Sequence, residues 1–191
     1  MSTLKELTWE FHKNAERQNF ARKLLKGELT DEKYAEYLAN QYVIYEALER
    51  WAKKAGILDG IEDICRADAI KKDIDQLMYG GFIIKKSAKK YIDWVHHLYN
   101  FKPILLLAHI YVRHFGDLHG GQMIARRVPG EGHYYKFNGN EKELIAKVRS
   151  RLEGKEQIFV GEAIKCFEFA TELFKELSNE QNMGQVNRLS R

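Results

Sequence analysis

Three side chains near the start of the chain have types and spacing that suit ligand binding. Lys5, His12 and Glu16 are separated by seven and four residues, so a helix would place all three close to one face. A neutral imidazole is a common metal ligand, and a carboxylate one turn away can orient it through its other nitrogen. A lysine two turns from the histidine can pair with an acidic group of the same ligand. The alternative is a partly buried histidine beside an exposed ion pair, and these residues alone favour that alternative.

A second candidate lies in the segment Gly-Asp-Leu-His-Gly-Gly at residues 116–121. Glycine costs about 1 kcal/mol in a helix interior, so three glycines within six residues need a reason. Gly116 and Gly120 would share a helix face, with Arg113 and Asp117 beside it. Missing Cβ atoms let a helix bend and approach a flat ligand, and an acid there can hold ordered water. A tight helix–helix crossing also uses glycine, but the acid and the arginine favour function.

Helical periodicity runs through almost the whole chain, so helices must position these residues. Thr30 has the type of an N-cap, and Ser87 can cap a later helix. The expected helices cover residues 4–18, a stretch from Thr30 to just before Gly56, a stretch ending at Gly80-Gly81, one after Ser87, one after Pro103 that the glycines interrupt, 141–152 and 157–177. Residues 129–132 read as a loop, and residues 134–137 are the only candidate strand. The predicted fold class is all-α, with helices packed around one core.

Composition limits the classes of protein that this chain can be. Its 191 residues, 45% hydrophobic and 30% charged, suit a single domain over residues 1–191, with residues 178–191 as a frayed tail. The net charge of +4 is spread along the chain, and no nucleic-acid-binding motif is present. The best apolar run, residues 104–108, is far too short to span a membrane, and no signal peptide is evident. We therefore expect a soluble, cytoplasmic monomer that binds neither membrane nor nucleic acid.

Residues 111–122 (Tyr-Val-Arg-His-Phe-Gly-Asp-Leu-His-Gly-Gly-Gln) resemble the distal-helix signature of heme oxygenases, a pattern close to Tyr-Thr-Arg-Tyr-Leu-Gly-Asp-Leu-Ser-Gly-Gly-Gln. Residues 4–8 leading to His12 resemble the proximal helix of that family, and residues 42–49 its long second helix. Residues 149–151 and 173–177 match later helices in the same order. The likeness covers about residues 3–178. It implies a soluble heme oxygenase of the bacterial, phage or plastid type, in which heme lies between a proximal helix and a kinked, glycine-rich distal helix.

The resemblance implies which residues hold heme b, which is both substrate and cofactor. His12 would be the ligand of the heme iron, and Glu16 its partner. Lys5, Arg149 and Tyr111 would hold the heme propionates.

The resemblance also implies the catalytic residues. Gly116 and Gly120 would let the distal helix lie against the heme face. Asp117 would anchor the water network that delivers protons to bound dioxygen, and Arg113 and Tyr45 would extend that network. The implied reaction opens heme to biliverdin, with isomer IX-alpha as the expected product, and releases iron and carbon monoxide. Electrons would come from ferredoxin, or from another reductase, docking on a basic rim that includes Arg126, Arg127 and Arg151.

Several positions depart from the family pattern, among them Val112 in place of a common Thr, and three of them bear on heme binding or its network. His119 stands where a small residue is usual, and it lies about 200° around the helix from Asp117, so we expect it to point away from heme. Ile145 replaces a basic residue, which leaves the propionates to Lys5 and Arg149. Ala170 replaces a polar Asn found in some members.

Other classes of protein compete with this interpretation. A heme carrier or sensor would keep His12 but would not need Asp117. A thiaminase-like enzyme would need a nucleophilic cysteine in the pocket. Cys65 follows a loop-like stretch and Cys166 occupies a helical core position, so neither is expected there. A di-iron carboxylate bundle would need paired Glu-x-x-His motifs, and we find none.

Overall fold

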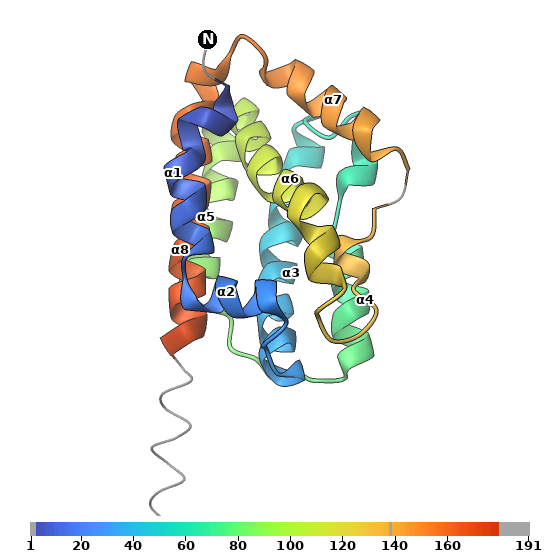
Figure 1. The fold of residues 1–191 in the computed structure, drawn as a ribbon. Coiled ribbons are helices and arrows are strands. Elements are labelled where there is room, and N and C mark those ends of the chain that lie inside the picture. Colours follow the sequence, from blue (N-terminus) through green and yellow to red (C-terminus); the bar gives the residue numbers. More distant parts are fainter. Residues whose placement is uncertain (1–2, 138, 180–191) are drawn as a thin grey trace, which may run out of the picture.

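The computed structural model describes residues 3–137 and 139–179, which form a bundle of helices (Figure 1). The α-helices are α1 (Leu4–Glu16), α2 (Asn19–Lys26), α3 (Asp31–Lys54), α4 (Ala67–Leu77), α5 (Lys86–Phe101), α6 (Leu106–Ala125), α7 (Glu141–Leu152) and α8 (Glu156–Asn179). Single 3₁₀ turns are η1 (Glu62–Ile64), η2 (Pro103–Leu105) and η3 (His133–Tyr135). No strand occurs in these two ranges, and η3 stands where the sequence offered its only candidate strand. The predicted all-α class is confirmed.

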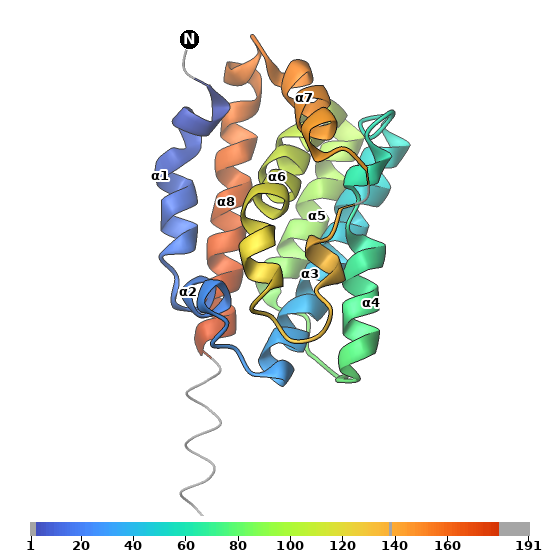
Figure 2. The ribbon, with the colours of Figure 1, turned by 45° about the vertical axis from the view of Figure 1, so that its right-hand side comes forward.

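The two helices that carry most of the candidate residues are held by a third. The C-terminal helix α8 packs against both α1 and α6, while α3 packs against α4 and α5. In both ribbon views α1 and α8 run side by side, and α6 crosses the bundle obliquely (Figures 1 and 2). None of the described helices combines the length and apolarity that a membrane span requires.

Side-chain caps fix where α1 and α3 begin. Thr3 accepts a hydrogen bond from the backbone N–H of Glu6, and the Glu6 carboxylate accepts one from the backbone N–H of Thr3 at 2.9 Å. Thr30 accepts a hydrogen bond from the backbone N–H of Lys33, as its type predicted. These caps set the helical register, and therefore the faces on which His12 and Tyr45 lie.

Several predicted helix ends need correction. Ser87 does not cap α5: Lys85 occupies the cap position, and the Ser87 hydroxyl donates instead to the Glu176 carboxylate of α8 at 2.9 Å. Helix α4 ends at Leu77, before the glycine pair, because Met78 adopts a left-handed φ of 55°. The short helix α2 was not anticipated. Ser178 lies inside α8, so the predicted tail begins too early, and its residues 180–191 lie outside the described ranges.

The expected interruption of α6 is wrong. The helix is continuous from Leu106 to Ala125, through all three glycines, and Pro103 opens the 3₁₀ turn just before it. Glycine weakens a helix but leaves the backbone hydrogen bonds intact. At Gly121 the reason for glycine is packing, because a Cβ atom there would lie 2.7 Å from Cδ1 of Tyr135. The following loop at residues 129–132 is confirmed, with left-handed φ angles at Gly130 and Gly132.

Candidate functional site

One cavity of about 450 Å³ contains the candidate residues. Helices α1 and α6 supply most of its lining, and α2, α3, α7, α8 and η3 complete it. The ten residues proposed from the sequence all line this cavity: Lys5, His12, Glu16, Tyr45, Tyr111, Arg113, Gly116, Asp117, Gly120 and Arg149. Packing has therefore brought together four helices whose candidate residues are distant in the sequence.

On the α1 side, His12 is held by two aromatic rings. Its imidazole stacks on Trp9 with the ring centroids 5.5 Å apart, and it meets the edge of Phe167 at 5.5 Å. One ring nitrogen, Nε2, lies 3.5 Å from the Glu16 carboxylate, as the four-residue spacing predicted. The other nitrogen, Nδ1, is buried without a hydrogen-bond partner. Because Glu16 approaches only one ring nitrogen, the imidazole retains a second nitrogen that could bind a metal carried by a ligand in the cavity.

On the α6 side, two glycines leave the helix backbone bare. A Cβ atom built at Gly116 or at Gly120 would meet no heavy atom within 4 Å. Both glycines line the cavity, so neither is required by helix–helix packing as Gly121 is. The backbone of α6 can therefore approach a flat ligand closely at these two positions.

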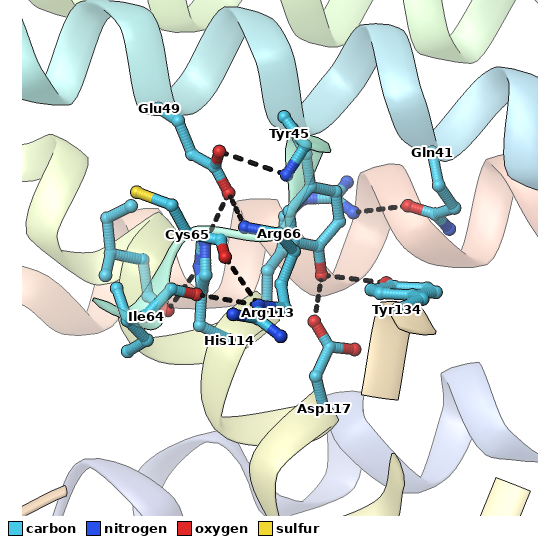
Figure 3. A network of polar contacts seen from close by, with 12 residues as sticks. Gln41, Tyr45, Glu49, Ile64, Cys65, Arg66, Arg113, His114, Asp117 and Tyr134 are labelled. Carbon is cyan, nitrogen blue, oxygen red and sulfur yellow. Dashed lines mark hydrogen bonds and ion pairs between the residues drawn. The ribbon is translucent and has the colours of Figure 1, made fainter. Parts of the chain in front are cut away.

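Asp117 lies one residue after Gly116 and is held by two tyrosines. The Tyr45 hydroxyl donates to Asp117 Oδ2 at 2.6 Å, and the Tyr134 hydroxyl donates to the Tyr45 oxygen at 3.0 Å (Figure 3). Burial raises the pKa of Asp117 to about 6, although the Tyr45 hydrogen bond and the nearby His114 and Arg113 side chains act in the opposite direction. Tyr134 was missed because its segment was considered only as a short strand.

Arg113 is a buried guanidinium, 8% exposed, on the same cavity wall. Its Nη1 donates to Oε1 of Gln41 at 3.3 Å, and its side chain lies 4.3 Å from the ring centroid of Tyr91. Its Nε and Nη2 atoms have no hydrogen-bond partner in the described part of the chain. Gln41 was also missed, although it lies one helical turn before Tyr45 and therefore on the same face of α3.

A second set of polar contacts lies next to Tyr45 and is centred on Glu49 (Figure 3). The Glu49 carboxylate accepts hydrogen bonds from the backbone N–H groups of Arg66 and Ala67, and it lies 3.0 Å from Nε2 of His114. The His114 ring lies 5.1 Å from the ring of Tyr45. His114 therefore links α6 to α3 as a core residue.

The mouth of the cavity carries basic side chains from three helices. Lys5 lies on α1 and Arg149 on α7, and Arg149 lies 5.9 Å from the ring centroid of Phe115. His119 of α6 also lines the cavity and stacks on Phe115 at 5.8 Å, so the expectation that it points away is wrong. The error came from measuring its angle from Asp117. The cavity face is centred near Gly116, and His119 lies only about 60° from that residue.

Two smaller residues of α8 also line the cavity. Cys166 is fully buried and lies on the cavity wall, so the sequence argument that placed it away from the pocket is wrong. Ala170 lies on the same wall, where its short side chain supplies no hydrogen bond. Cys65 does not line the cavity and is half-buried.

The fold and the cavity define a helical-bundle protein in which a histidine and a helix face formed by glycines line one ligand site. The family model for heme oxygenase matches residues 1–176 of the chain. The chain belongs to the heme oxygenase family.

Individual relatives agree with this assignment. Heme oxygenase 2 of Macaca fascicularis is 32% identical over 91% of this chain, and heme oxygenase of Rhodella violacea is 29% identical over 92%. The chain spans 64% of the Macaca protein, just under two thirds, and 86% of the Rhodella protein.

Solved structures agree on the fold. Heme oxygenase-1 from the cyanobacterium Synechocystis, in complex with heme, superposes with a TM-score of 0.81 at 25% identity and covers 98% of this chain and 97% of its own. Heme oxygenase from Leptospira interrogans gives 0.80 at 27% identity, covering 91% and 97%.

Proposed function

We propose that this protein is a heme oxygenase that opens heme to biliverdin, with release of iron and carbon monoxide. Dioxygen is the co-substrate, and the electrons come from an external donor. The observation that carries the proposal is that His12, with an unpaired nitrogen, and Asp117, with a raised pKa, line the same cavity. Family membership and the heme-bound Synechocystis structure support it.

The residues present fit heme as a ligand. A cavity of about 450 Å³ falls in the usual range for small-molecule sites. His12 would bind the iron through the nitrogen that Glu16 does not contact. Gly116 and Gly120 would lie against the flat face, while Lys5, Arg149 and Tyr111 would hold the propionates at the mouth. When bound, heme supplies both the iron that activates dioxygen and the carbon framework that is oxidised.

We propose that Asp117 accepts and donates protons in the cavity. A carboxyl group with a pKa near 6 exchanges protons readily close to neutral pH. The Tyr45 hydroxyl fixes one carboxyl oxygen, and Tyr134 fixes that hydroxyl in turn. Arg113 lies on the same wall with two unpaired nitrogen atoms, Nε and Nη2, whose N–H groups can hold water. A proton can thus reach the substrate through ordered water, without a side chain pressing directly on the reacting oxygen.

A carrier or sensor that binds heme without turnover is the nearest alternative function. Such a protein needs His12 but has no use for a buried acid held by two tyrosines. Burying Asp117 beside the cavity is costly, since burial alone pushes its pKa upward. The cost of burying Asp117 therefore favours an enzyme over a carrier or sensor.

Membership of the family also suggests the domain organisation, the location, the oligomeric state and the electron donor. We infer that residues 1–191 act as one domain, as a cytoplasmic monomer, and that a small acidic ferredoxin donates the electrons. Its docking face would include Arg126, Arg127 and Arg151, and a flavin reductase is the alternative donor. Ferredoxin-driven turnover that is unchanged by charge removal at all three arginines would contradict this face.

An absorbance time course tests the enzyme directly. The protein is loaded with one equivalent of hemin and supplied with ferredoxin, its reductase and NADPH in air. We expect the Soret band to decay into the broad red absorbance of biliverdin. A stable Soret band under reduction would favour the carrier, and no Soret band at all would overturn the heme proposal.

Two variants assign the roles. Asp117→Ala should retain hemin binding and lose most biliverdin formation, whereas Asp93→Ala, an exposed aspartate on α5 outside the cavity, should behave as wild type. His12→Ala should lose the histidine-type spectrum, and added imidazole should partly restore it. Wild-type biliverdin yield from Asp117→Ala would contradict the proton role.

A further inference from the structure

His119 is a cavity residue to which the proposed reaction gives no task. Its ring lies nearly parallel to that of Phe115, with 12° between the planes and 5.8 Å between centroids. The imidazole is therefore held against Phe115 on the cavity wall, and the residue is exposed to solvent. Its neighbours on the cavity lining include Lys5 of α1 and Arg149 of α7.

The charges around His119 are mostly positive. The charged groups that face its ring are Lys5 on α1 and Arg149 and Glu141 on α7. Partial burial, Arg149 and Lys5 lower the pKa of His119 below its usual value of about 6.5, and Glu141 opposes them. In the protein alone the imidazole is thus mostly neutral at neutral pH. An anionic group that binds beside His119, Lys5 and Arg149 would raise the pKa of His119 and favour its protonated form.

We propose that His119 is a further carboxylate-binding residue at the cavity mouth, acting with Lys5 and Arg149 to select tetrapyrroles that carry free carboxylates. The proposal rests on the proposed function, because it takes heme as the ligand. Imidazolium donates hydrogen bonds from both ring nitrogens, so it can bridge two acidic groups or pair with one. His119 is a positioning residue: it orients the substrate at the mouth and does not touch the reacting carbon.

The role of His119 has a defined dependence on pH. Bound carboxylates raise the pKa of the imidazole, so the complex takes up a proton that the free protein does not hold. Affinity for the acidic ligand therefore increases as pH falls from 8 toward 6. A ligand whose carboxylates are esterified cannot produce this increase, since it brings no negative charge.

Hemin and hemin dimethyl ester are the probes that test the proposal. Dissociation constants are measured by Soret titration at pH 6.0 and pH 8.0 for wild type, His119→Ser and His119→Gln. The control is His97→Ser, because His97 is exposed on α5 and does not line the cavity. Measuring the ester separates charge pairing from packing against Phe115.

We expect His119→Ser to weaken hemin binding about two- to fivefold at pH 6.0, with little effect at pH 8.0 and none on the ester. His119→Gln should restore part of the affinity without the dependence on pH, and His97→Ser should match wild type. Equal losses for hemin and its ester, or no loss at all, would overturn the proposal. So would a ferric spectrum with two histidine ligands that disappears in His119→Ser, since His119 would then bind the iron.

The failure of this inference is distinguishable from failure of the proposed function. If wild type binds neither hemin nor its ester, the heme proposal itself fails. If wild type binds both and His119→Ser binds both equally well, only the role of His119 fails.

Discussion

Asp117 is a buried carboxyl group whose ionisation works against folding. Its pKa of about 6 exceeds the value of about 3.9 expected in the unfolded chain. The folded protein therefore binds a proton more tightly than the unfolded chain does between these two values. Stability contributed by this group falls as pH rises from about 4 through 6, and the full penalty persists above that.

Replacing Asp117 by Asn should remove this penalty. We expect Asp117→Asn to be more stable than wild type by on the order of 2–3 kcal/mol at pH 7.5, since each pKa unit is worth 1.36 kcal/mol. The difference should shrink toward zero at pH 4, where both side chains are neutral. Urea unfolding of the heme-free protein at several pH values measures it, with Asp93→Asn as the exposed control. An equal difference at every pH would show that the pKa is not raised.

Gln41 is a neutral partner for a buried charge. It is 4% exposed, and its carbonyl oxygen accepts a hydrogen bond from Nη1 of Arg113, a side chain in which Nε and Nη2 are already unpaired. Replacing it by Leu of similar size removes an acceptor from a buried cation, so we expect a loss of about 1–3 kcal/mol in unfolding free energy. Gln41→Glu should be tolerated better because it supplies a carboxylate to the guanidinium.

Urea unfolding of the heme-free variants checks the Gln41 prediction. Gln122→Leu is the matched control, because Gln122 is exposed on α6. A loss in Gln41→Leu no larger than in this control would mean that Arg113 does not depend on Gln41.

At the scale of elements, the glycines of α6 serve two different purposes. Gly116 and Gly120 face open space, whereas Gly121 is pressed against Tyr135. Gly116 and Gly120 therefore leave room for a ligand, whereas Gly121 leaves room for a side chain packed against the helix. The sequence shows three glycines without showing this division, because the division depends on what packs against each face.

Alanine substitutions at Gly120 and Gly121 should have opposite effects on stability. Gly120→Ala should stabilise the heme-free protein by up to about 1 kcal/mol through helix propensity, and it should weaken hemin binding because the new methyl group enters the cavity. Gly121→Ala should destabilise the heme-free protein, since its Cβ atom would meet Tyr135 at 2.7 Å.

Urea unfolding and Soret titration of both variants measure the two effects. Hemin affinity that falls in Gly121→Ala while remaining unchanged in Gly120→Ala would contradict the assigned faces.

Features confined to one helix could be predicted from the sequence. The cap at Thr30 and the approach of Glu16 to His12 depend only on local backbone geometry, and both are present. Contacts between elements could not be derived in this way. Tyr134 of η3 donates a hydrogen bond to Tyr45, and Ser87 donates one to Glu176 of α8. Both bonds depend on how separate segments pack, which no single segment specifies. His119 was misplaced because its angle was measured from Asp117, and the sequence does not show that the face of α6 turned to the cavity is centred near Gly116.

At the scale of the whole molecule, the cavity lies between two helices that each pack mainly against a third. Helices α1 and α6 both pack on α8, and between them lies the site where His12 and the glycine face converge. A ligand that contacts both helices adds a connection that the heme-free fold lacks. Binding to the folded state alone must then raise the temperature of unfolding.

Hemin should therefore raise the Tm of this protein by about 5–10 °C when free hemin is about 100 times its Kd. That concentration adds about 2.7 kcal/mol, and a chain of this size gains about 2–4 °C per kcal/mol. Differential scanning calorimetry at equal ligand concentrations measures the shift for hemin and for iron-free protoporphyrin. The shift with hemin should exceed that with protoporphyrin, because only hemin offers an iron to His12. In His12→Ala the two ligands should give equal shifts, while His96→Ala, an exposed control on α5, should retain the difference. A difference between the ligands that survives in His12→Ala would mean that another residue binds the iron.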